Sequence, residues 1–296
     1  MINPKLDPWT EGYLSYLVDV RRMASGTIRD VRCTMKRVCE SMAKLCPDTA
    51  LWKLTLEDYL RWINYEREAG RTSNTLAKDL SHIRGLLDYA WRSGRSDRNV
   101  LDGFSLQDSV RSVAPRVLCL DEAKRLLEVC GSKNKIQRRD RMVVLLLYGC
   151  GLRTNELREL DLADIDLERQ EIFVRQGKGD RQRTIPVASA VWTELLAYLS
   201  ERDGKRGALF RTEIKKKKLN ASSISEIVKN AARSAGLHGE VTPKTLRHTF
   251  ATHLMDKGVD LAVISSLMGH RSPQETGVYL HVLPGKAQNA VTKLAI

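Results

Sequence analysis

Apolar residues recur at helical spacing over the first part of this chain, and the pattern then stops. Residues 8–94 are predicted to form four helical segments, separated by turns that contain Gly or Pro. Residues 95–117 are rich in Ser, Asp, Asn, Gly and Arg and show no periodicity, which is typical of a linker. A chain of 296 residues is long enough to form two hydrophobic cores. We therefore predict a helical N-terminal domain at residues 1–94, a linker at 95–117 and a second domain at 118–296.

The second domain is predicted to be mostly helical with one small sheet. Residues 142–148 form an apolar run that indicates a buried helix, and two glycines follow it directly. Residues 171–175 and 183–187 are typical of two short strands, and the glycine-rich segment between them indicates a turn. The predicted fold class is therefore mainly α with a small antiparallel β-sheet.

The net charge of +13 is unevenly distributed. Residues 1–110 contain 17 Lys and Arg against 15 Asp and Glu, whereas the rest of the chain contains 32 against 21. Such a cationic C-terminal part suits the phosphate backbone of DNA, which releases counterions when it is bound. A solvated basic surface, or one attracted to an anionic membrane, would produce the same excess.

The six cysteines lack the close pairs and neighbouring histidines of a metal site, and they indicate free thiols in a reducing compartment. The N-terminus lacks the apolar core of a signal peptide, and no run is long enough to cross a bilayer. We expect a cytoplasmic protein that has no membrane partner, metal or cofactor.

Short motifs in the second domain contain the residue types needed for phosphoryl transfer. Gly-Leu-Arg-Thr-Asn-Glu-Leu contains Arg153 and Glu156, and Leu-Arg-His-Thr-Phe contains Arg247; His270 and Tyr279 follow in this order. Two forked guanidinium groups can bind the charge that develops on the oxygens of a phosphodiester, and a tyrosine can be the nucleophile. Alone, Arg153 and Glu156 would indicate an ordinary surface ion pair. The ordered set of motifs favours a catalytic site.

In this order, the motifs resemble those of the tyrosine recombinases, also called phage-type integrases. The resemblance covers the whole C-terminal part and is to the simple two-domain kind, either Xer-like or transposon-encoded. It implies that Arg153, Arg247 and His270 bind the scissile phosphate and that Tyr279 attacks it. Glu156 would orient neighbouring groups. The first domain would then be a helical core-binding (SAM-like) domain that closes over DNA.

Further basic residues receive roles from the same resemblance. Lys178, at the tip of the predicted hairpin, would protonate the departing 5′ oxygen, and Arg181 and Arg183 would contact the DNA backbone. The sequence departs from the family at Lys244, where recombinases usually have histidine. We expect Lys244 to bind the phosphate rather than to accept a proton, because an ammonium accepts a proton only if its pKa is strongly lowered.

The predicted function is site-specific DNA recombination through a 3′-phosphotyrosyl intermediate and a Holliday junction. The resemblance implies a homotetramer on two paired double-stranded DNA sites, together with an accessory protein or a second recombinase. Dimer resolution, transposition and phage integration or excision all stay open. A type IB topoisomerase would share the nucleophile but relax supercoils without pairing sites, and a catalytically silent DNA-binding protein would never become covalently attached.

Overall fold

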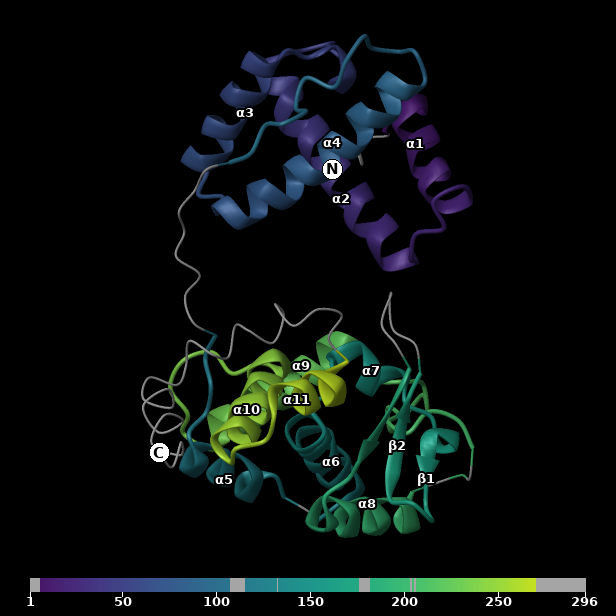
Figure 1. Ribbon diagram of the computed structural model, residues 1–296, viewed down its shortest axis with the longest axis vertical. Helices are drawn as coiled ribbons and strands as arrows, with labels where there is room; N and C mark the ends of the chain where they lie inside the picture. Colours follow the sequence, from purple (N-terminus) through teal and green to yellow (C-terminus); the bar gives the residue numbers. More distant parts are fainter. Residues whose placement is uncertain are drawn as a thin grey trace, which may run out of the picture. The chain divides into compact units, whose positions relative to one another are not determined.

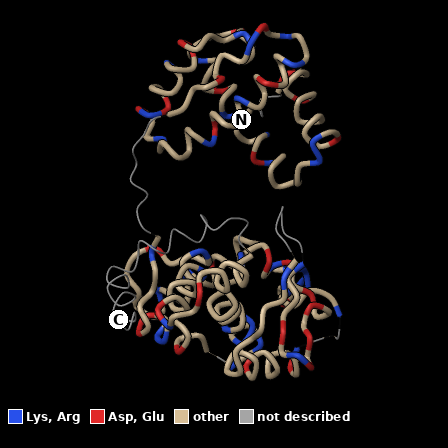
Figure 2. The backbone as a smooth tube through the Cα atoms, in the orientation of Figure 1, with Lys and Arg blue, Asp and Glu red and all other residues tan. Residues whose placement is uncertain are grey.

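The chain forms two compact units, Met1–Ser112 and Val113–Ile296 (Figure 1). The computed structural model describes residues 6–106, 115–131, 133–175, 182–202, 204 and 206–269. The predicted site residues Lys178, Arg181, His270 and Tyr279 lie outside these ranges. Basic residues occur throughout both units and are interspersed with acidic ones (Figure 2).

Over residues 6–106, the N-terminal unit is a bundle of four α-helices. Side-chain hydroxyls of Thr55 and Thr72 accept hydrogen bonds from backbone amides in the first turns of two of these helices, as expected at N-caps. The longest helix contacts the other three and contributes the fully buried Met35 and Val38 to the core. The helices are α1 (Pro8–Asp19), α2 (Ser25–Leu45), α3 (Leu56–Glu68) and α4 (Ser73–Arg92), with a 3₁₀ turn at Leu51–Lys53.

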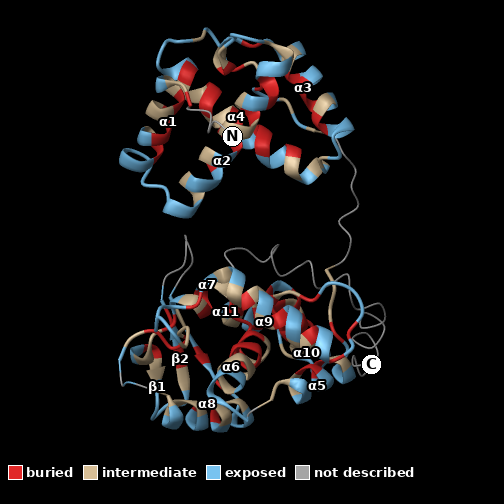
Figure 3. Ribbon diagram, turned by 180° about the vertical axis from the view of Figure 1, so that it is seen from behind, coloured by how far each residue is buried: buried red, intermediate tan, exposed pale blue. Residues whose placement is uncertain are grey.

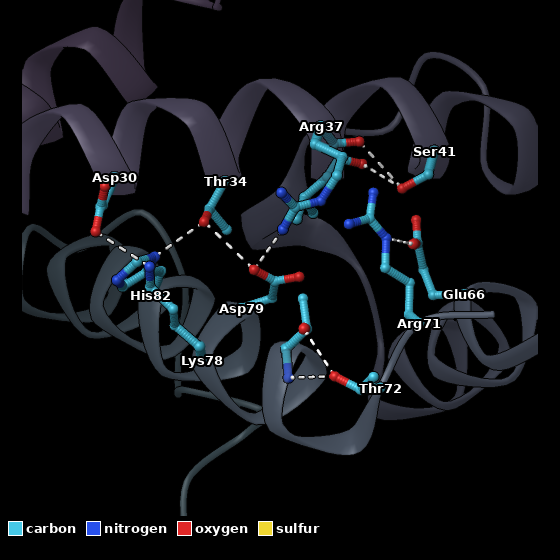
Figure 4. Close-up of polar contacts among 12 residues, drawn as sticks. Asp30, Thr34, Arg37, Ser41, Glu66, Arg71, Thr72, Lys78, Asp79 and His82 are labelled. Atoms are coloured by element: carbon cyan, nitrogen blue, oxygen red, sulfur yellow. Dashed lines mark hydrogen bonds and ion pairs between the residues drawn. The ribbon is translucent and has the colours of Figure 1, made fainter. Parts of the chain in front are cut away.

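Buried polar contacts join α2 to α3 and α4. Asp79 on α4 is only 2% exposed and forms an ion pair with Arg37 of α2 (Figure 4). The same carboxylate accepts a 3.3 Å hydrogen bond from Thr34 of α2. Trp62 Nε1 of α3 donates a 2.7 Å bond to Ser41 Oγ of α2. Because buried polar groups are costly unless they are paired, these contacts help to specify how the helices pack.

The N-terminal unit extends beyond its last helix into the segment predicted as linker. Leu101 is fully buried in the core of this unit. Asn99 Nδ2 donates a 2.6 Å hydrogen bond to Asp88 on α4, and Arg84 Nη2 donates a 2.6 Å bond to the carbonyl of Phe104. Residues 99–104 are therefore part of the folded unit, and their apolar residues Val100, Leu101 and Phe104 pack in or against its core.

The C-terminal unit is built around one central helix, α6. Six consecutive residues of α6, Met142 to Leu147, are buried, as the apolar run predicts (Figure 3). This helix contacts α5, α7, α8, α9 and α10. The helices of this unit are α5 (Leu120–Val129), α6 (Lys135–Gly149), α7 (Thr154–Glu159), α8 (Ser189–Glu201), α9 (Ala221–Ser234), α10 (Pro243–Asp256) and α11 (Leu261–Met268).

A small antiparallel sheet of order β1-β2-β3 completes the unit, with β1 at Ile165–Asp166, β2 at Glu171–Val174 and β3 at Arg183–Pro186. Ile172 of β2 lies opposite Ile185 of β3, and both are buried. A mainly helical chain with a small antiparallel sheet is confirmed. None of the helices in the described ranges is long and apolar enough to cross a membrane.

The chain enters the C-terminal unit through contacts with α10. The amide of Leu118 donates a 3.0 Å hydrogen bond to Thr249 Oγ1, and its carbonyl lies 2.9 Å from His253 Nε2. The other ring nitrogen of His253 lies 2.9 Å from the hydroxyl of Tyr148 on α6. Both nitrogens of His253 thus have partners within the fold, so this histidine helps to hold the packing of α6, α10 and the entering chain.

Candidate active site

The turn between α6 and α7 places Arg153. Gly151 has a φ of +60°, a left-handed conformation that favours glycine, and a Cβ there would lie 2.4 Å from a ring carbon of Phe250 on α10. The turn therefore packs against α10 at a distance that no side chain would permit. Arg153 follows as the N-cap residue of α7, and Glu156 lies in the first turn of that helix.

Glu156 is the centre of an arginine cluster. Its carboxylate accepts hydrogen bonds from Nη1 and Nη2 of Arg183, both 2.9 Å, and from Nη1 and the backbone amide of Arg153, 2.9 and 2.8 Å. Nη1 of Arg247 lies 3.8 Å from the same carboxylate. Three arginines from α7, β3 and α10 thus share one acidic partner, which is only 7% exposed. We call Arg153, Glu156, Arg183 and Arg247 the arginine cluster.

The cluster keeps Glu156 ionised. Burial by itself would raise the pKa of this carboxyl, but the hydrogen bonds and charge of Arg183, then the amide of Arg153 and the charge of Arg247, lower it to about 2. At neutral pH the carboxylate is therefore fully charged. Because one negative charge faces three positive ones, the cluster retains a net positive charge that suits an anionic ligand.

The same three arginines hold the C-terminal end of α11. Nε of Arg183 donates to the carbonyl of Leu267 (2.6 Å), Nη2 of Arg247 to that of Met268 (2.6 Å), and Nη2 of Arg153 to that of Gly269 (3.1 Å). Three consecutive carbonyls, which a helix leaves unpaired at this end, each accept from a different arginine.

Gly269 ends α11 in a left-handed conformation with a φ of +62°. The residue that follows is His270, the first of the C-terminal residues outside the described ranges. The arginine cluster thus determines where the chain leaves α11 toward His270 and Tyr279.

Access to solvent differs within the cluster. The side chain of Arg153 is 29% exposed, whereas those of Arg183 and Arg247 are 7% and 9% exposed. Nη1 of Arg247 also donates a 2.6 Å bond to the carbonyl of Gly151, which ties α10 to the turn before Arg153. Arg153 is therefore the member of the cluster most accessible to a ligand.

The buried position of Arg183 does not fit the DNA-backbone contact predicted for it. Both of its Nη atoms are bonded to Glu156 and its Nε to α11, so the guanidinium faces the interior. Arg183 lies two residues before the buried Ile185 on β3, and side chains two apart on a strand share a face. This alternation is the sequence signal that could have identified Arg183 as inward-facing.

Lys244 lies in the first turn of α10, three residues before Arg247, and is exposed. Its neighbour His248 is half-buried, and burial, followed by the charges of Lys244 and Arg247, lowers the pKa of His248 to about 4. His248 is therefore neutral at pH 7, and the cations next to it are Lys244 and Arg247. Across the described part of the chain, no group of three or more His, Cys, Asp or Glu could hold a metal ion.

The geometry agrees with comparisons to known proteins. Residues 116–286 match the phage integrase family, and residues 10–94 match the N-terminal SAM-like domain of phage integrases. This chain belongs to the phage integrase family. The prediction of a tyrosine recombinase with a helical, SAM-like N-terminal domain is confirmed.

Proteins that match most of this chain in sequence are named tyrosine recombinases. The chain is 30% identical to a tyrosine recombinase of Pseudothermotoga lettingae over 289 residues, which cover 96% of this chain and 97% of that protein. It is 41% identical to tyrosine recombinase XerA of Pyrococcus furiosus over 181 residues, 60% of this chain and 62% of that protein.

Solved structures show the same fold. The crystal structure of XerA recombinase matches 97% of this chain and 99% of its own, with 25% identity and a TM-score of 0.54. The Tn1549 transposon integrase, in complex with transposon right end DNA, matches 96% of this chain and 98% of its own with a TM-score of 0.76. At 19% identity, this second match supports the fold alone.

Proposed function

We propose that this site-specific DNA recombinase cleaves DNA by attack of Tyr279 on a phosphodiester held at the arginine cluster. The observation that supports the proposal most strongly is the convergence of Arg153 and Arg247 on one carboxylate and on the end of α11. These arginines come from motifs that are 94 positions apart in the sequence. The helix they hold ends at Met268, two residues before His270.

The reaction transfers a phosphodiester from one oxygen to another. The phenolic oxygen of Tyr279 forms a bond to phosphorus, and the bond from phosphorus to the 5′ oxygen breaks. The proton of the phenol passes to solvent water, and the departing 5′ oxygen receives one from Lys178. The product is a 3′-phosphotyrosyl link with a free 5′ hydroxyl, and attack by the hydroxyl of another strand reverses the step and exchanges strands.

The arginine cluster supplies positive charge where the reaction develops negative charge. Arg153 is partly exposed and oriented by two partners, Glu156 and the carbonyl of Gly269, so its guanidinium is fixed before the phosphate binds. Lys244 and His270 would bind the non-bridging oxygens. Arg247 positions the turn that holds Arg153 and adds its own positive charge to the cluster. Arg183 is a positioning residue because it acts through Glu156 and α11.

Strand exchange between two DNA sites requires an assembly of several copies of the protein. Four copies on two paired DNA sites would exchange strands in two steps through a Holliday junction, with an accessory protein or a second recombinase where the site requires one.

All six cysteines are free, which fits the cytoplasmic location that we propose.

The proposal is tested with Arg153→Ala on nicked DNA that carries the recombination site recovered from the flanking sequence. Loss of one preorganised donor should reduce the cleavage rate by roughly 100-fold or more, with DNA binding changed much less. Arg158→Ala is the matched control, because Arg158 lies on the same helix and pairs with the exposed Glu159. An unchanged cleavage rate in Arg153→Ala would refute the proposed site, and relaxation of supercoiled DNA that lacks a site would favour a topoisomerase.

A further inference from the structure

A second cluster of basic side chains lines a small pocket in the C-terminal unit. The pocket has a volume of about 50 Å³, enough for a carboxylate group or for a few water molecules. Its walls come from the first turns of α6, the end of α8 and the loop that follows Arg206. The basic residues that line it are Lys135, Arg138, Arg139, Arg202, Arg211 and Lys216, and we call this site the basic pocket.

The basic pocket lies far from the arginine cluster. Lys135 begins α6, whereas Gly149 ends it and leads into the turn held by Arg247. A 15-residue helix is about 22 Å long at a rise of 1.5 Å per residue. One DNA phosphate therefore cannot contact both sites, and the proposed chemistry leaves the basic pocket without a role.

Backbone carbonyls fix the guanidinium groups of the pocket. Arg202 donates from Nε to the carbonyl of Leu209 (3.1 Å) and from Nη1 to that of Gly204 (2.6 Å). Arg139 Nη1 donates a 3.2 Å bond to the carbonyl of Arg211. The charges of Arg202 and Arg211 are close enough to repel each other, and after burial this repulsion is the main cause that lowers the pKa of Arg202. An anion between them would relieve that repulsion.

Acidic neighbours only partly neutralise the basic pocket. Glu201 forms an ion pair with Arg138, and Glu213 lies 3.5 Å from Lys216. Asp140, which does not itself line the pocket, accepts bonds of 2.8 and 2.6 Å from Arg139. These three acids face six basic lining residues. The pocket therefore keeps a surplus of positive charge and is preorganised for a carboxylate or a phosphate.

The loop that forms one wall of the pocket displays an apolar side chain. Arg211 and Lys218 form an antiparallel bridge, and the amide of Thr212 donates a 2.8 Å bond to the carbonyl of Lys217. Ile214 lies between these anchors and is 94% exposed, the highest exposure among the large hydrophobic residues in the described ranges. Lys215, Lys216 and Lys217 follow it. Ile214 is therefore an apolar side chain presented to solvent by a closed loop, next in sequence to the pocket residue Glu213.

We propose that the basic pocket and Ile214 form a docking surface for an acidic segment of a partner protein. Carboxylates of the partner would enter the pocket, and an apolar side chain between them would cover Ile214. Residues 280–296 of this chain contain two lysines and no acidic residue, so the chain's own C-terminus lacks the required charge. A DNA backbone would match the pocket but offers no apolar side chain for Ile214.

The test uses the full-length protein and a short fluorescein-labelled peptide of repeated Glu-Asp-Leu triplets. Fluorescence anisotropy should show binding that weakens with salt, and a peptide of Gln-Asn-Leu triplets should not bind. The double variant Lys135→Glu/Lys216→Glu should weaken peptide binding by roughly tenfold or more, and Ile214→Ser by about threefold. Lys124→Glu/Lys229→Glu is the matched control, because it makes the same charge change at exposed positions of α5 and α9.

The remaining outcomes would overturn the proposal. Equal weakening in the control variant would mean that the peptide senses only the net charge of the protein. Unchanged peptide binding in Ile214→Ser would mean that the peptide makes no apolar contact with Ile214, and this contact is what distinguishes a protein partner from DNA. If the pocket variant instead weakened the binding of non-specific duplex DNA well beyond the control variant, the pocket would be a DNA contact.

Discussion

Replacing Glu156 with glutamine should destabilise the C-terminal unit, because it removes the one carboxylate shared by three arginines. The pKa of Glu156 is lowered from 4.5 to about 2, and each pKa unit corresponds to about 1.4 kcal/mol. The fold thus favours the charged form over the neutral one by about 3 kcal/mol. A neutral glutamine should lose this contribution, and breaking a buried ion pair by removing one partner has a similar cost of roughly 3 to 5 kcal/mol.

Hydrogen exchange at the amides of Val143 to Leu147 measures this loss, because these residues of α6 are buried in the core of the C-terminal unit and exchange when that unit opens. Glu159→Gln is the matched control. Glu159 lies on the same helix and pairs with Lys218, but its side chain is 52% exposed, so its loss should cost less than about 1 kcal/mol. The reasoning is refuted if Glu156→Gln costs no more than Glu159→Gln.

The effect of Glu156 should also depend on pH. Its folded pKa is lower than its unfolded one, so its contribution is complete above about 4.5 and is lost as the pH falls toward about 2. The difference in the free energy of unfolding between wild type and Glu156→Gln should therefore shrink to about half at pH 3. A difference that stays constant from pH 7 to pH 3 would mean that the charge of Glu156 is not its cause.

Three further substitutions test other parts of the account. Gly151→Ala combines a left-handed φ with a Cβ 2.4 Å from the Phe250 ring, so it should lower the free energy of unfolding by roughly 2 kcal/mol or more in urea denaturation, whereas Gly258→Ala, at an open glycine with a similar φ, should cost less. Lys244→Ala should slow cleavage of nicked DNA by about tenfold or more while Lys244→His retains most of the rate; equal rates for both would remove Lys244 from the site. His253→Ala should lower the free energy of unfolding by roughly 1 to 3 kcal/mol through loss of its bonds to Tyr148 and Leu118, with cleavage by the folded protein retained.

Local patterns in the sequence predicted much of the fold. The apolar run at residues 142–148 corresponds to the buried part of α6, and the two β-rich segments correspond to β2 and β3. The start of α6 at Lys135 was missed because its first turns are polar. The packing of residues 99–104 on the N-terminal unit was missed because it depends on single contacts, such as Arg84 with Phe104, rather than on periodicity.

The candidate site was partly predictable. The order of the motifs led us to assign Arg153, Glu156 and Arg247 to one catalytic site, and in the structure these three side chains lie together. The three carbonyls at the end of α11 could not be predicted, because their contacts join residues that are distant in sequence. The role of Arg183 was missed because the resemblance suggested a DNA contact, although strand alternation favoured the interior.

Covalent trapping tests the central claim most directly. Wild type and Tyr279→Phe would be incubated in EDTA with nicked DNA that carries the recombination site, and the products separated under denaturing conditions. The account predicts a protein–DNA adduct with wild type, linked through a 3′ phosphate, and none with Tyr279→Phe. An adduct of equal yield in Tyr279→Phe would contradict the assignment of the nucleophile, and specific binding with no adduct from wild type would indicate a catalytically silent DNA-binding protein.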